Sequence, residues 1–496
     1  MKQNTQHNPG PIGKNILHPD LPFDMKPRIN KAVEDIHLRQ VVSEAAQGKN
    51  AKRRKAFYET FGERLDEVRI HAGNIKQHVL DHLDHYLETF TENAENTGAV
   101  VHYAVDAAEA RSICLSLASA AGCRLCVKSK SMVTEEINLV SVLQEAGIET
   151  IETDLGEFIV QLDGDAPSHI VTPMIHKDRY AVAETFSREL GSKYAEEPEV
   201  QTRIARDYMR NKFRKADLGV SGANFLVAES GSIVLCTNEG NGCMTTGMPD
   251  LHIVFAGIEK LIPRISDLAV FLKLLARSST AQPLTVYTSI ITGPRRSSDM
   301  SGPRQLHIIL VDNGRTKVLQ EESREILRCI RCGACLNICP VFRSVGGGHA
   351  YGSVYSGPIG AALTPNINGL NNYPDLPQAS SLCGACYEVC PVHIDLPSQL
   401  IRLRRDLVSY HQPRLYERLA YRFWAKILQH LWLYRISVKI QRILLRQLAA
   451  GVADGKDKYI QEAPFPLSLW TDKRDLPAPA REDFRTWWRK RNGKHR

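Results

Sequence analysis

The sequence has no long apolar run and no loop typical of nucleotide binding. No stretch of the 496 residues approaches the roughly 18 uninterrupted apolar residues of a membrane span. The first fifteen residues are polar and lack the apolar segment of a secretory signal, so we expect a cytoplasmic protein. Neither G-x-G-x-x-G after a predicted strand nor G-x-x-x-x-G-K-[ST] occurs. These absences argue against a Rossmann or P-loop site, so any flavin or NAD would be carried by a partner.

Cysteine, in contrast, is well represented, and seven of the twelve cysteines form two ordered runs. The first, from Cys329 to Pro340, reads C-x2-C-x2-C-x3-C-P, the spacing of bacterial ferredoxins. The second, from Cys383 to Pro391, repeats the C-x2-C-x3-C-P end of the first. A zinc knuckle is the alternative, but zinc motifs lack the C-x2-C-x2-C triplet. The runs therefore predict iron–sulfur clusters and reduced thiols.

The ferredoxin pattern is crossed, because the last cysteine of each run binds the cluster of the other run. We therefore predict two clusters, each bound by cysteines from both runs. The ligands expected for the first cluster are Cys329, Cys332, Cys335 and Cys390. Those expected for the second cluster are Cys339, Cys383 and Cys386.

The second set holds only three thiols, which leaves its fourth ligand open. Ser380 stands where the leading cysteine of a complete run would fall, and His349 and His393 lie in the same segment. A non-cysteine ligand, an open iron site and a [3Fe–4S] cluster are the three alternatives. We expect two [4Fe–4S] clusters, of which the second is more labile or more accessible to solvent.

Positive charge is concentrated in one segment. The formal net charge is +8, and residues 401–446 contain eleven Lys and Arg against two acids, or about +9. Such a segment suits an acidic partner, an anionic membrane surface or nucleic acid. Apolar residues interleave with the arginines, which indicates either an amphipathic surface helix or a helix packed on the cluster domain, and we favour packing. No DNA-reading motif occurs, so we expect no nucleic-acid partner.

The order of predicted elements indicates an α/β fold followed by helices. Strands alternate with helices of 10–15 residues after a helical segment over 30–96, which favours a parallel sheet. We predict an extended arm over 1–29, an α/β domain over 30–318, a ferredoxin-type domain over 319–400, and a basic helical region with a tail over 401–496. The expected strands span 99–105, 124–128, 149–153, 225–229, 233–237, 252–256, 285–291 and 305–311. Little regular structure is expected over 341–382, and long helices over 398–409 and 415–448.

Two groups of polar residues in the α/β domain are candidates for ligand binding. Glu229, Asn238 and Glu239 lie at the ends of predicted strands and could line a pocket at the carboxyl edge of the sheet, although turn formation explains them equally well. Lys128 and Lys130 flank a strand-to-helix corner that would receive a carboxylate or phosphate. The alternative there is a helix N-cap with solvated lysines, which we favour slightly.

A third group could bind a divalent metal, although a charged loop is the commoner explanation. It comprises Glu152, Asp154, Glu157, His169 and His176. The five cysteines outside the two runs are interpreted as small buried apolar residues and not as metal ligands. They are Cys114, Cys123, Cys126, Cys236 and Cys243.

Several longer segments together resemble the lactate utilization protein B family. They are 'VKSKSMVTEEI', 'ETDLGEFIVQL', 'PSHIVTPMIHK', 'GANFLVAESGSIVLCTNEGNG', 'LRCIRCGACLNICPV', 'GHAYGSVYSGPIGA' and 'ASSLCGACYEVCPV'. The resemblance implies iron–sulfur proteins of the bacterial three-component L-lactate oxidation system. It also implies an α/β domain like the CoA-transferase and sugar-phosphate-isomerase group, a ferredoxin-type domain and a family-specific C-terminal region. It assigns no catalytic residues.

These observations lead to one main hypothesis and one alternative. We expect an iron–sulfur electron-transfer component of a complex that oxidises L-lactate to pyruvate, working with other subunits and a membrane-surface or quinone-linked acceptor. We expect it in the cytoplasm or peripherally at the inner membrane. In the alternative, the α/β domain is itself an enzyme acting on a small carboxylate or acyl thioester, and the clusters serve structure or sensing.

Overall fold

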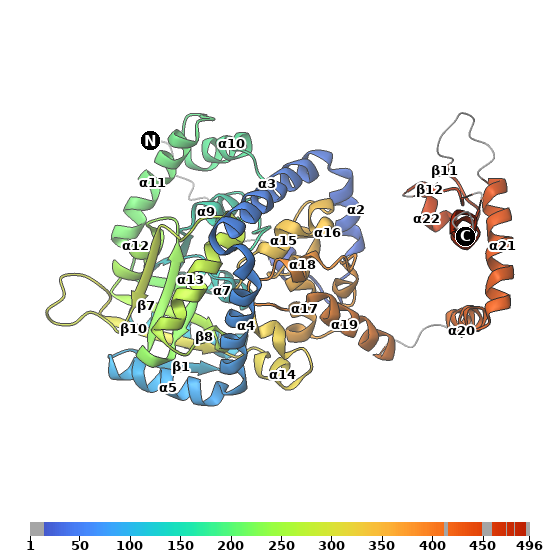
Figure 1. Cartoon of the computed structure of the whole chain (residues 1–496). Helices are drawn as coiled ribbons and strands as arrows, with labels where there is room; N and C mark the ends of the chain where they lie inside the picture. The colour runs from blue at the N-terminus through green and yellow to red at the C-terminus, as the bar shows by residue number, and fades with distance from the viewer. Residues whose placement is uncertain (1–13, 411–414, 449–458, 473, 481, 493–496) are drawn as a thin grey trace. The chain divides into compact units, whose positions relative to one another are not determined.

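The computed structural model describes residues 14–410, 415–448, 459–472, 474–480 and 482–492 (Figure 1). The chain divides into two compact units, Met1–Leu407 and Val408–Arg496. The larger unit contains the predicted α/β and ferredoxin-type segments, and the smaller unit contains most of the basic segment. Each unit is described by itself below.

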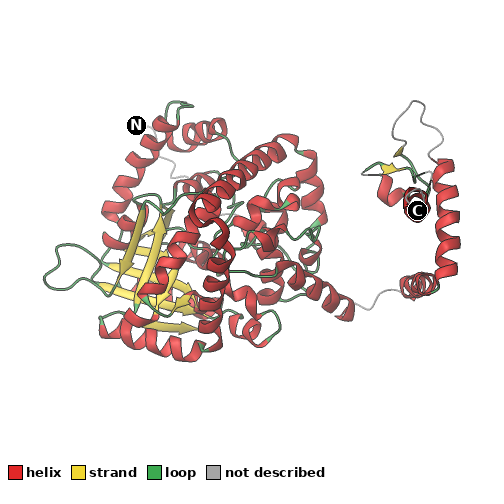
Figure 2. Cartoon of the chain, viewed as in Figure 1, coloured by secondary structure: helices red, strands yellow, loops and turns green. Residues whose placement is uncertain are grey.

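A six-stranded parallel sheet forms the centre of the α/β part (Figure 2). Its order is β1-β10-β7-β4-β2-β3. Residues along the central strand alternate between two cores, as the two-residue period of a strand requires. Ile253 and Phe255 pack in one core, while Val254 and Ala256 pack in the other. The strands are β1 (Val100–Ala104), β2 (Leu125–Lys128), β3 (Glu149–Glu152), β4 (Leu218–Gly222), β7 (Leu251–Gly257) and β10 (Gln305–Val311).

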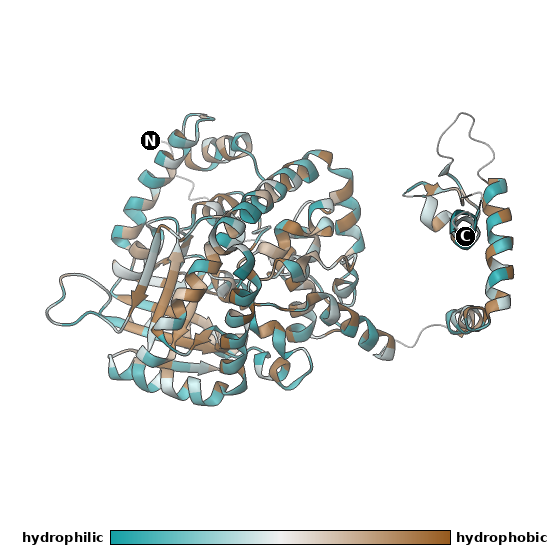
Figure 3. Cartoon of the chain, viewed as in Figure 1, coloured by the Kyte–Doolittle hydropathy of each residue, from teal (hydrophilic) through white to brown (hydrophobic). Residues whose placement is uncertain are grey.

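Helices cover both faces of this sheet, and the strands are more hydrophobic than the outer surfaces of the helices (Figure 3). Three helices contribute to the core that contains Ile253: α6 (Ala107–Ala120), α7 (Met132–Glu136) and α8 (Leu139–Glu145). Three more pack near β2 and β3: α9 (Leu155–Leu162), α10 (Arg179–Leu190) and α11 (Pro198–Lys215). The helix predicted after β2 is interrupted, because Asn138 adopts a left-handed conformation between α7 and α8.

A smaller four-stranded sheet lies beside the first, in the order β8-β5-β6-β9. Strands β5 and β6 pair antiparallel as a hairpin. The bounds are β5 (Phe225–Val227), β6 (Ser232–Thr237), β8 (Leu261–Ile262) and β9 (Tyr287–Ile291). Helices α12 (Asn241–Gly247) and α13 (Ile265–Thr280) complete this part. All eight predicted strands are present, and β4 and β8 were not predicted.

The N-terminal helices join the α/β part to the cysteine-rich part. They are α2 (Lys26–Glu34), α3 (Ile36–Phe61), α4 (Leu65–Asp81) and α5 (Leu83–Asn96). Helix α3 contacts both α13 and the helices of the first cysteine run. The extended arm predicted over 1–29 is wrong for its described portion, because α1 (Lys14–Leu17) and the start of α2 are helical. Residues 1–13 of that prediction lie outside the described residues.

The cysteine-rich part consists of short helices that surround the two cysteine runs. Before and within the first run are α14 (Arg315–Gln320), α15 (Ala334–Ile338) and α16 (Pro340–Ser344), and α18 (Ala385–Glu388) belongs to the second. Helix α19 (Leu396–Tyr410) follows, as predicted. The prediction of little regular structure over 341–382 is wrong, because α17 (Gly357–Asn368) is a buried helix of twelve residues.

The smaller unit is helical, with one short pair of strands. The helix predicted over 415–448 is two helices, α20 (Leu415–Gln429) and α21 (Leu431–Leu448), and neither has a buried residue. The tail forms β11 (Tyr459–Ile460), α22 (Ser468–Thr471), β12 (Leu476–Pro477) and α23 (Phe484–Asn492). Among the described residues, no helix is long and apolar enough to cross a membrane.

Candidate functional site

Four cysteines from the two runs line a single apolar cavity. Three come from the loop before α15 and from its first turn, and the fourth follows α18. Ile170, Ile359 and Ile394 form part of the wall. We call these four residues the first thiol set: Cys329, Cys332, Cys335 and Cys390. This is the group that the crossed ferredoxin pattern predicts for the first cluster.

The remaining three cysteines, Cys339, Cys383 and Cys386, are the second thiol set. Helices α15 and α18 contact each other, which brings this set beside the first. Burial, together with the nearby thiols of Cys339 and Cys383, raises the pKa of Cys386 to about 12. Burial also raises the pKa of Cys335, with contributions from its own set and from Cys386. The two sets are therefore electrostatic neighbours.

The two runs share one backbone conformation. Arg331 and Gly333 have positive φ angles of 59° and 77°, and Leu382 and Gly384 repeat them with 54° and 84°. Positive φ angles turn the chain so that its N–H groups face inward, toward the sulfurs. In the first run the N–H of Arg331 donates to Cys329 Sγ at 3.4 Å. The matching N–H of Leu382 donates to Ser380 Oγ at 3.1 Å.

Ser380 is therefore the local counterpart of Cys329, while the two candidate histidines have other partners. His393 Nε2 lies 2.9 Å from the hydroxyl of Tyr387. His349 Nε2 lies 2.6 Å from the carbonyl oxygen of Ala166. Cys383 is exposed, unlike the buried Cys339 and Cys386, so the second set lies closer to solvent.

Buried cations surround the first thiol set. Arg69 donates to the carbonyl oxygens of Cys390 and Tyr387, both at 2.8 Å, and Arg53 donates to Val389 at 3.0 Å. The side chains of Lys76, Lys260 and Arg331 also lie within electrostatic range of Cys329. An iron–sulfur cluster with four thiolates carries net negative charge, which these cations would balance. The donor set and its surroundings therefore fit such a cluster.

A second cavity, of about 280 Å³, lies at the carboxyl edge of the parallel sheet. Residues that follow β2, β3, β4 and β7 line it, and strand order reverses between β2 and β4. Open α/β sheets bind ligands at such a reversal. We call it the sheet-edge cavity, and its polar lining includes Lys130, Asp154, Asn224, Asn238, Glu239, Lys260 and Arg331.

The two polar groups that the sequence suggested for ligand binding both contribute to this cavity, although one residue of each group does not line it. Asn238, Glu239 and Lys130 line it. Glu229 does not, because its Oε2 accepts a hydrogen bond of 2.9 Å from the N–H of Ile265, at the start of α13. Lys128 is fully buried elsewhere, 2.8 Å from Glu152 and 3.7 Å from Glu157.

Sequence reasoning missed the other cations of the sheet-edge cavity, Lys260 and Arg331. Lys260 follows β7 and stands next to Glu259 between apolar residues, and this charged pair in an apolar stretch was the available signal. Arg331 stands inside the cysteine run, where the spacing of the cysteines says nothing about neighbouring side chains. Its Nη2 donates to Glu259 at 3.2 Å, and its Nη1 is buried without a hydrogen-bond partner.

The metal site considered around Glu152 and Glu157 is not formed. Burial alone lowers the pKa of Lys128, but the carboxylates of Glu152 and Glu157 raise it above its ordinary value. The lysine thus occupies the place that a cation would take. His169 is also engaged, because its Nδ1 accepts hydrogen bonds from the N–H groups of Val171 and Thr172.

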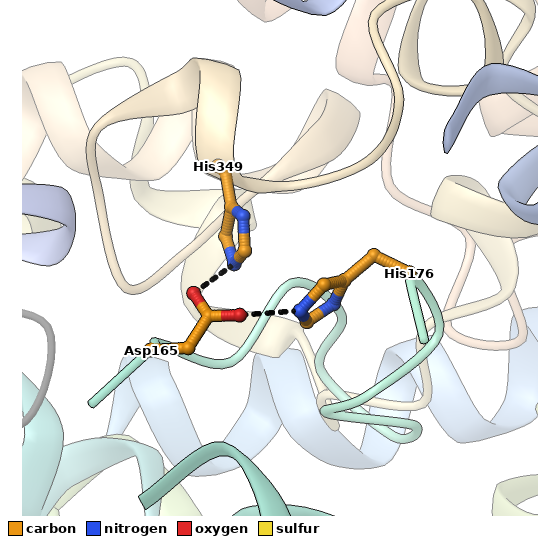
Figure 4. Close-up of side chains that lie close together, drawn as sticks. All are labelled: Asp165, His176 and His349. Carbon is orange, nitrogen blue, oxygen red and sulfur yellow. Dashed lines mark hydrogen bonds and ion pairs between the residues drawn. The ribbon is translucent and has the colours of Figure 1, made fainter. Parts of the chain in front are cut away.

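His176 instead joins Asp165 and His349 in a compact group (Figure 4). Asp165 lies 2.8 Å from His176 Nε2 and 3.6 Å from His349 Nε2. Lys177 lies 3.2 Å from the same carboxylate and already supplies positive charge. We therefore interpret the group as an ion-pair contact that ties the loop after α9 to the segment after the first cysteine run.

Comparison with known families defines the class of protein. The LUD domain matches residues 87–311, and the 4Fe-4S dicluster domain matches residues 325–394. A third family, lactate utilisation protein B, C-terminal, matches residues 410–493. The chain is thus an iron–sulfur protein that combines a mixed α/β LUD domain, a dicluster domain and a helical C-terminal region.

Relatives of nearly equal length identify the family. Lactate utilization protein B of Oceanobacillus iheyensis is 42% identical, with 94% of this chain and 96% of the relative covered. The protein of that name in Bacillus subtilis is 41% identical, with coverages of 95% and 97%. An uncharacterized electron transport protein, YkgF, of Escherichia coli is also 41% identical, with coverages of 94% and 96%. The chain belongs to the lactate utilization protein B family, as the sequence motifs predicted.

Among solved structures, a DUF162 family protein from Deinococcus radiodurans matches part of the chain. The match has a TM-score of 0.28 and 14% identity, and it covers 46% of this chain and 98% of that one. The role in lactate utilization therefore rests on the sequence relatives and on the iron–sulfur domain.

Proposed function

We propose that this chain is the iron–sulfur electron-transfer component of a system that oxidises L-lactate to pyruvate. The observation that carries the proposal is the pair of adjacent thiol sets, which the contact between α15 and α18 brings together. Lactate oxidation releases two electrons and two protons, and two bound clusters supply two one-electron carriers. The chain's own part is to hold the thiols, balance their charge and exclude water from the first set.

The proposal includes two [4Fe–4S] clusters. The first is bound by Cys329, Cys332, Cys335 and Cys390. The second is bound by Cys339, Cys383 and Cys386, with Ser380 as the candidate fourth ligand. Support for Ser380 comes from the N–H of Leu382, which donates to Ser380 as the N–H of Arg331 donates to Cys329.

The proposed partners are the other subunits of a lactate oxidation complex and a membrane-surface or quinone-linked acceptor. Cys383 is exposed, which suits the second cluster for electron exchange with a partner. The basic residues of α20 and α21 suit an anionic surface, so we propose a cytoplasmic protein at the inner face of the membrane. Domain bounds of 30–318, 319–400 and 401–496, and a CoA-transferase-like α/β fold, complete the proposal.

Anaerobic purification tests this function directly. The full chain should be brown, contain about eight irons and give an EPR signal after reduction with dithionite. In a system reconstituted with its partners, L-lactate should bleach the visible absorption of the clusters. Fresh anaerobic protein with iron near zero, or with zinc in its place, would overturn the proposal.

A second function is favoured by the sheet-edge cavity, which lies where α/β enzymes bind ligands. In this alternative the α/β part is itself an enzyme acting on a small carboxylate or acyl thioester. The Cys335→Ser variant discriminates between the two functions in the reconstituted system. Loss of lactate oxidation together with the first cluster supports electron transfer, whereas activity retained after cluster loss supports the alternative.

A further inference from the structure

The sheet-edge cavity and the cavity of the first thiol set share a wall. Ile170, Arg331 and Cys332 line both cavities. Cys332 is a predicted cluster ligand, so a molecule in the sheet-edge cavity would lie one side chain away from the first cluster. Because of this shared wall, the sheet-edge cavity differs from an ordinary surface hollow.

The cavity also contains cationic groups that make no hydrogen bond to the described residues. Lys260 is 7% exposed, and no hydrogen bond or ion pair to its ammonium group is found in the described part of the chain. Lys130 enters from the loop after β2 and is likewise without one in the residues that the structure describes. Arg331 adds a buried Nη1 that lacks a hydrogen-bond partner. A buried ammonium group such as that of Lys260 is costly without a hydrogen-bond partner, which indicates that an anion completes the site.

The balance of charge favours a singly charged ligand. Glu259 neutralises much of the charge of Arg331, and Asp154 and Glu239 lie close enough to Lys130 to offset part of its charge. Asp154 and Glu239 line the same cavity and would repel a dianion such as phosphate. Leu275 and Ala276 provide an apolar surface for a methyl group.

We propose that the sheet-edge cavity binds a small monocarboxylate, with Lys130 and Lys260 as its anion-binding residues and Arg331 beside the first cluster. A volume of about 280 Å³ lies at the lower end of the usual range for ligand pockets and suits a three-carbon acid. The choice of a 2-hydroxy or 2-oxo acid, L-lactate or pyruvate, rests on the proposed function. The carboxylate class rests on the cavity alone.

Isothermal titration calorimetry of the anaerobically purified full chain with pyruvate and with L-lactate tests the proposal. Lys130→Gln and Lys260→Gln should each weaken binding about tenfold or more, because each removes a charged hydrogen-bond donor. Lys55→Gln makes the same change in charge at an exposed position of α3 that does not line the cavity, and it should bind like the unaltered protein. Binding should also change the EPR signal of the dithionite-reduced protein, because Cys332 is part of the shared wall.

Three results would overturn the inference. They are absence of heat with either acid, unchanged affinity in both lysine variants, and equal affinity for inorganic phosphate. Iron content is measured on the same samples, which distinguishes failure of this inference from failure of the proposed function. A normal iron content without carboxylate binding would contradict this inference and leave the proposed function intact. Carboxylate binding by a protein that contains no iron would contradict the proposed function and leave the carboxylate site intact.

Discussion

At the scale of the residue, the two cysteine runs differ in the atom that accepts one shared backbone hydrogen bond. Cys329 Sγ and Ser380 Oγ accept from the backbone two residues further along, at 3.4 and 3.1 Å. The serine thus keeps the conformation of a complete run and replaces sulfur with oxygen. A hard, protonated oxygen is a poorer ligand for iron than a thiolate, which accounts for a labile second cluster.

Ser380→Cys should therefore complete the second cluster. We expect iron content near eight to persist longer in air than in the unaltered protein, because a fourth thiolate now closes the exposed site. Ser380→Ala should give a larger [3Fe–4S] EPR signal after brief oxidation. Ser381→Cys, which places a thiol at the neighbouring exposed position, is the matched control. Equal iron retention in all of these variants would contradict a ligand role for Ser380.

Glu239 makes carboxylate binding dependent on pH. Burial and the neighbouring Asp154 together raise the pKa of Glu239 to about 7, with Lys130 opposing the shift. The side chain is neutral below pH 7 and becomes anionic above it, whereas pyruvate stays ionised throughout. Pyruvate affinity should fall about three- to tenfold between pH 6 and 8, as measured by calorimetry. Burial also lowers the pKa of Lys260 to about 8, so loss of its charge adds to the fall near pH 8. Glu239→Gln should therefore reduce the fall in affinity, and an unchanged profile in that variant would refute the role of Glu239.

The cluster cysteines could be predicted from sequence because their spacing is local. Lys260 and Arg331 could not, because they meet only when the end of β7 approaches the first cysteine run. Glu229 and Lys128 show the converse error. Lys128 ends β2 and Glu229 lies just after β5, so both resembled ligand-binding residues. Lys128 instead pairs with two buried carboxylates, and Glu229 accepts a hydrogen bond from the start of α13.

At the scale of secondary-structure elements, helices α3 and α4 position the second cysteine run. Arg69 on α4 donates to two carbonyl oxygens of that run, and α4 passes close enough that a Cβ on Gly73 would lie 2.8 Å from the carbonyl oxygen of Val392. These helices belong to the predicted α/β domain by sequence. Their contacts nevertheless hold Cys390, the fourth member of the first thiol set.

Arg69→Ala should therefore loosen the first cluster without touching a ligand. Loss of two charge-assisted hydrogen bonds should cost about 2–4 kcal/mol of stability and speed the loss of iron to a chelator. Arg54→Ala, an exposed change on α3, is the control. Iron loss at the same rate in both variants would show that Arg69 has no such role.

Strand β4 and helix α17 were not predicted, because their compositions are not typical of a strand or a helix. Strand β4 contains two glycines, and a Cβ on Gly219 would lie 2.1 Å from the carbonyl oxygen of Thr245, so close packing requires glycine there. Helix α17 contains Pro365 and begins with Gly357 and Pro358, residues that favour loops. The predicted strands are mostly rich in Val and Ile, so their own composition indicates a strand without information about the elements packed against them.

At the scale of the whole molecule, charge is distributed unevenly between the two thiol sets. Arg53, Lys76, Lys260 and Arg331 all interact with thiols of the first set. Among the described residues, the cation recorded beside Cys339 of the second set is Arg343. Positive charge stabilises the reduced, more negative state of a cluster, so the first cluster should have the higher reduction potential.

Redox titration followed by EPR checks this order. The first cluster should be reduced before the second, and Arg53→Gln should lower its potential by about 50 mV or more, from one charge removed at low dielectric. Arg54→Gln removes a charge from the same helix at an exposed position and should leave both potentials unchanged. A shift of equal size in both clusters would contradict the assignment of Arg53 to the first.

The wall that Ile170, Arg331 and Cys332 provide to two cavities has a thermodynamic consequence. An electron arriving on the first cluster adds negative charge beside an anion-binding site, which weakens that site's hold on a carboxylate. By reciprocity, a bound carboxylate makes the cluster harder to reduce by the same free energy. Reduction of the first cluster and release of the anion are thereby coupled through one layer of side chains, so that each reduction of the cluster favours release of the bound carboxylate.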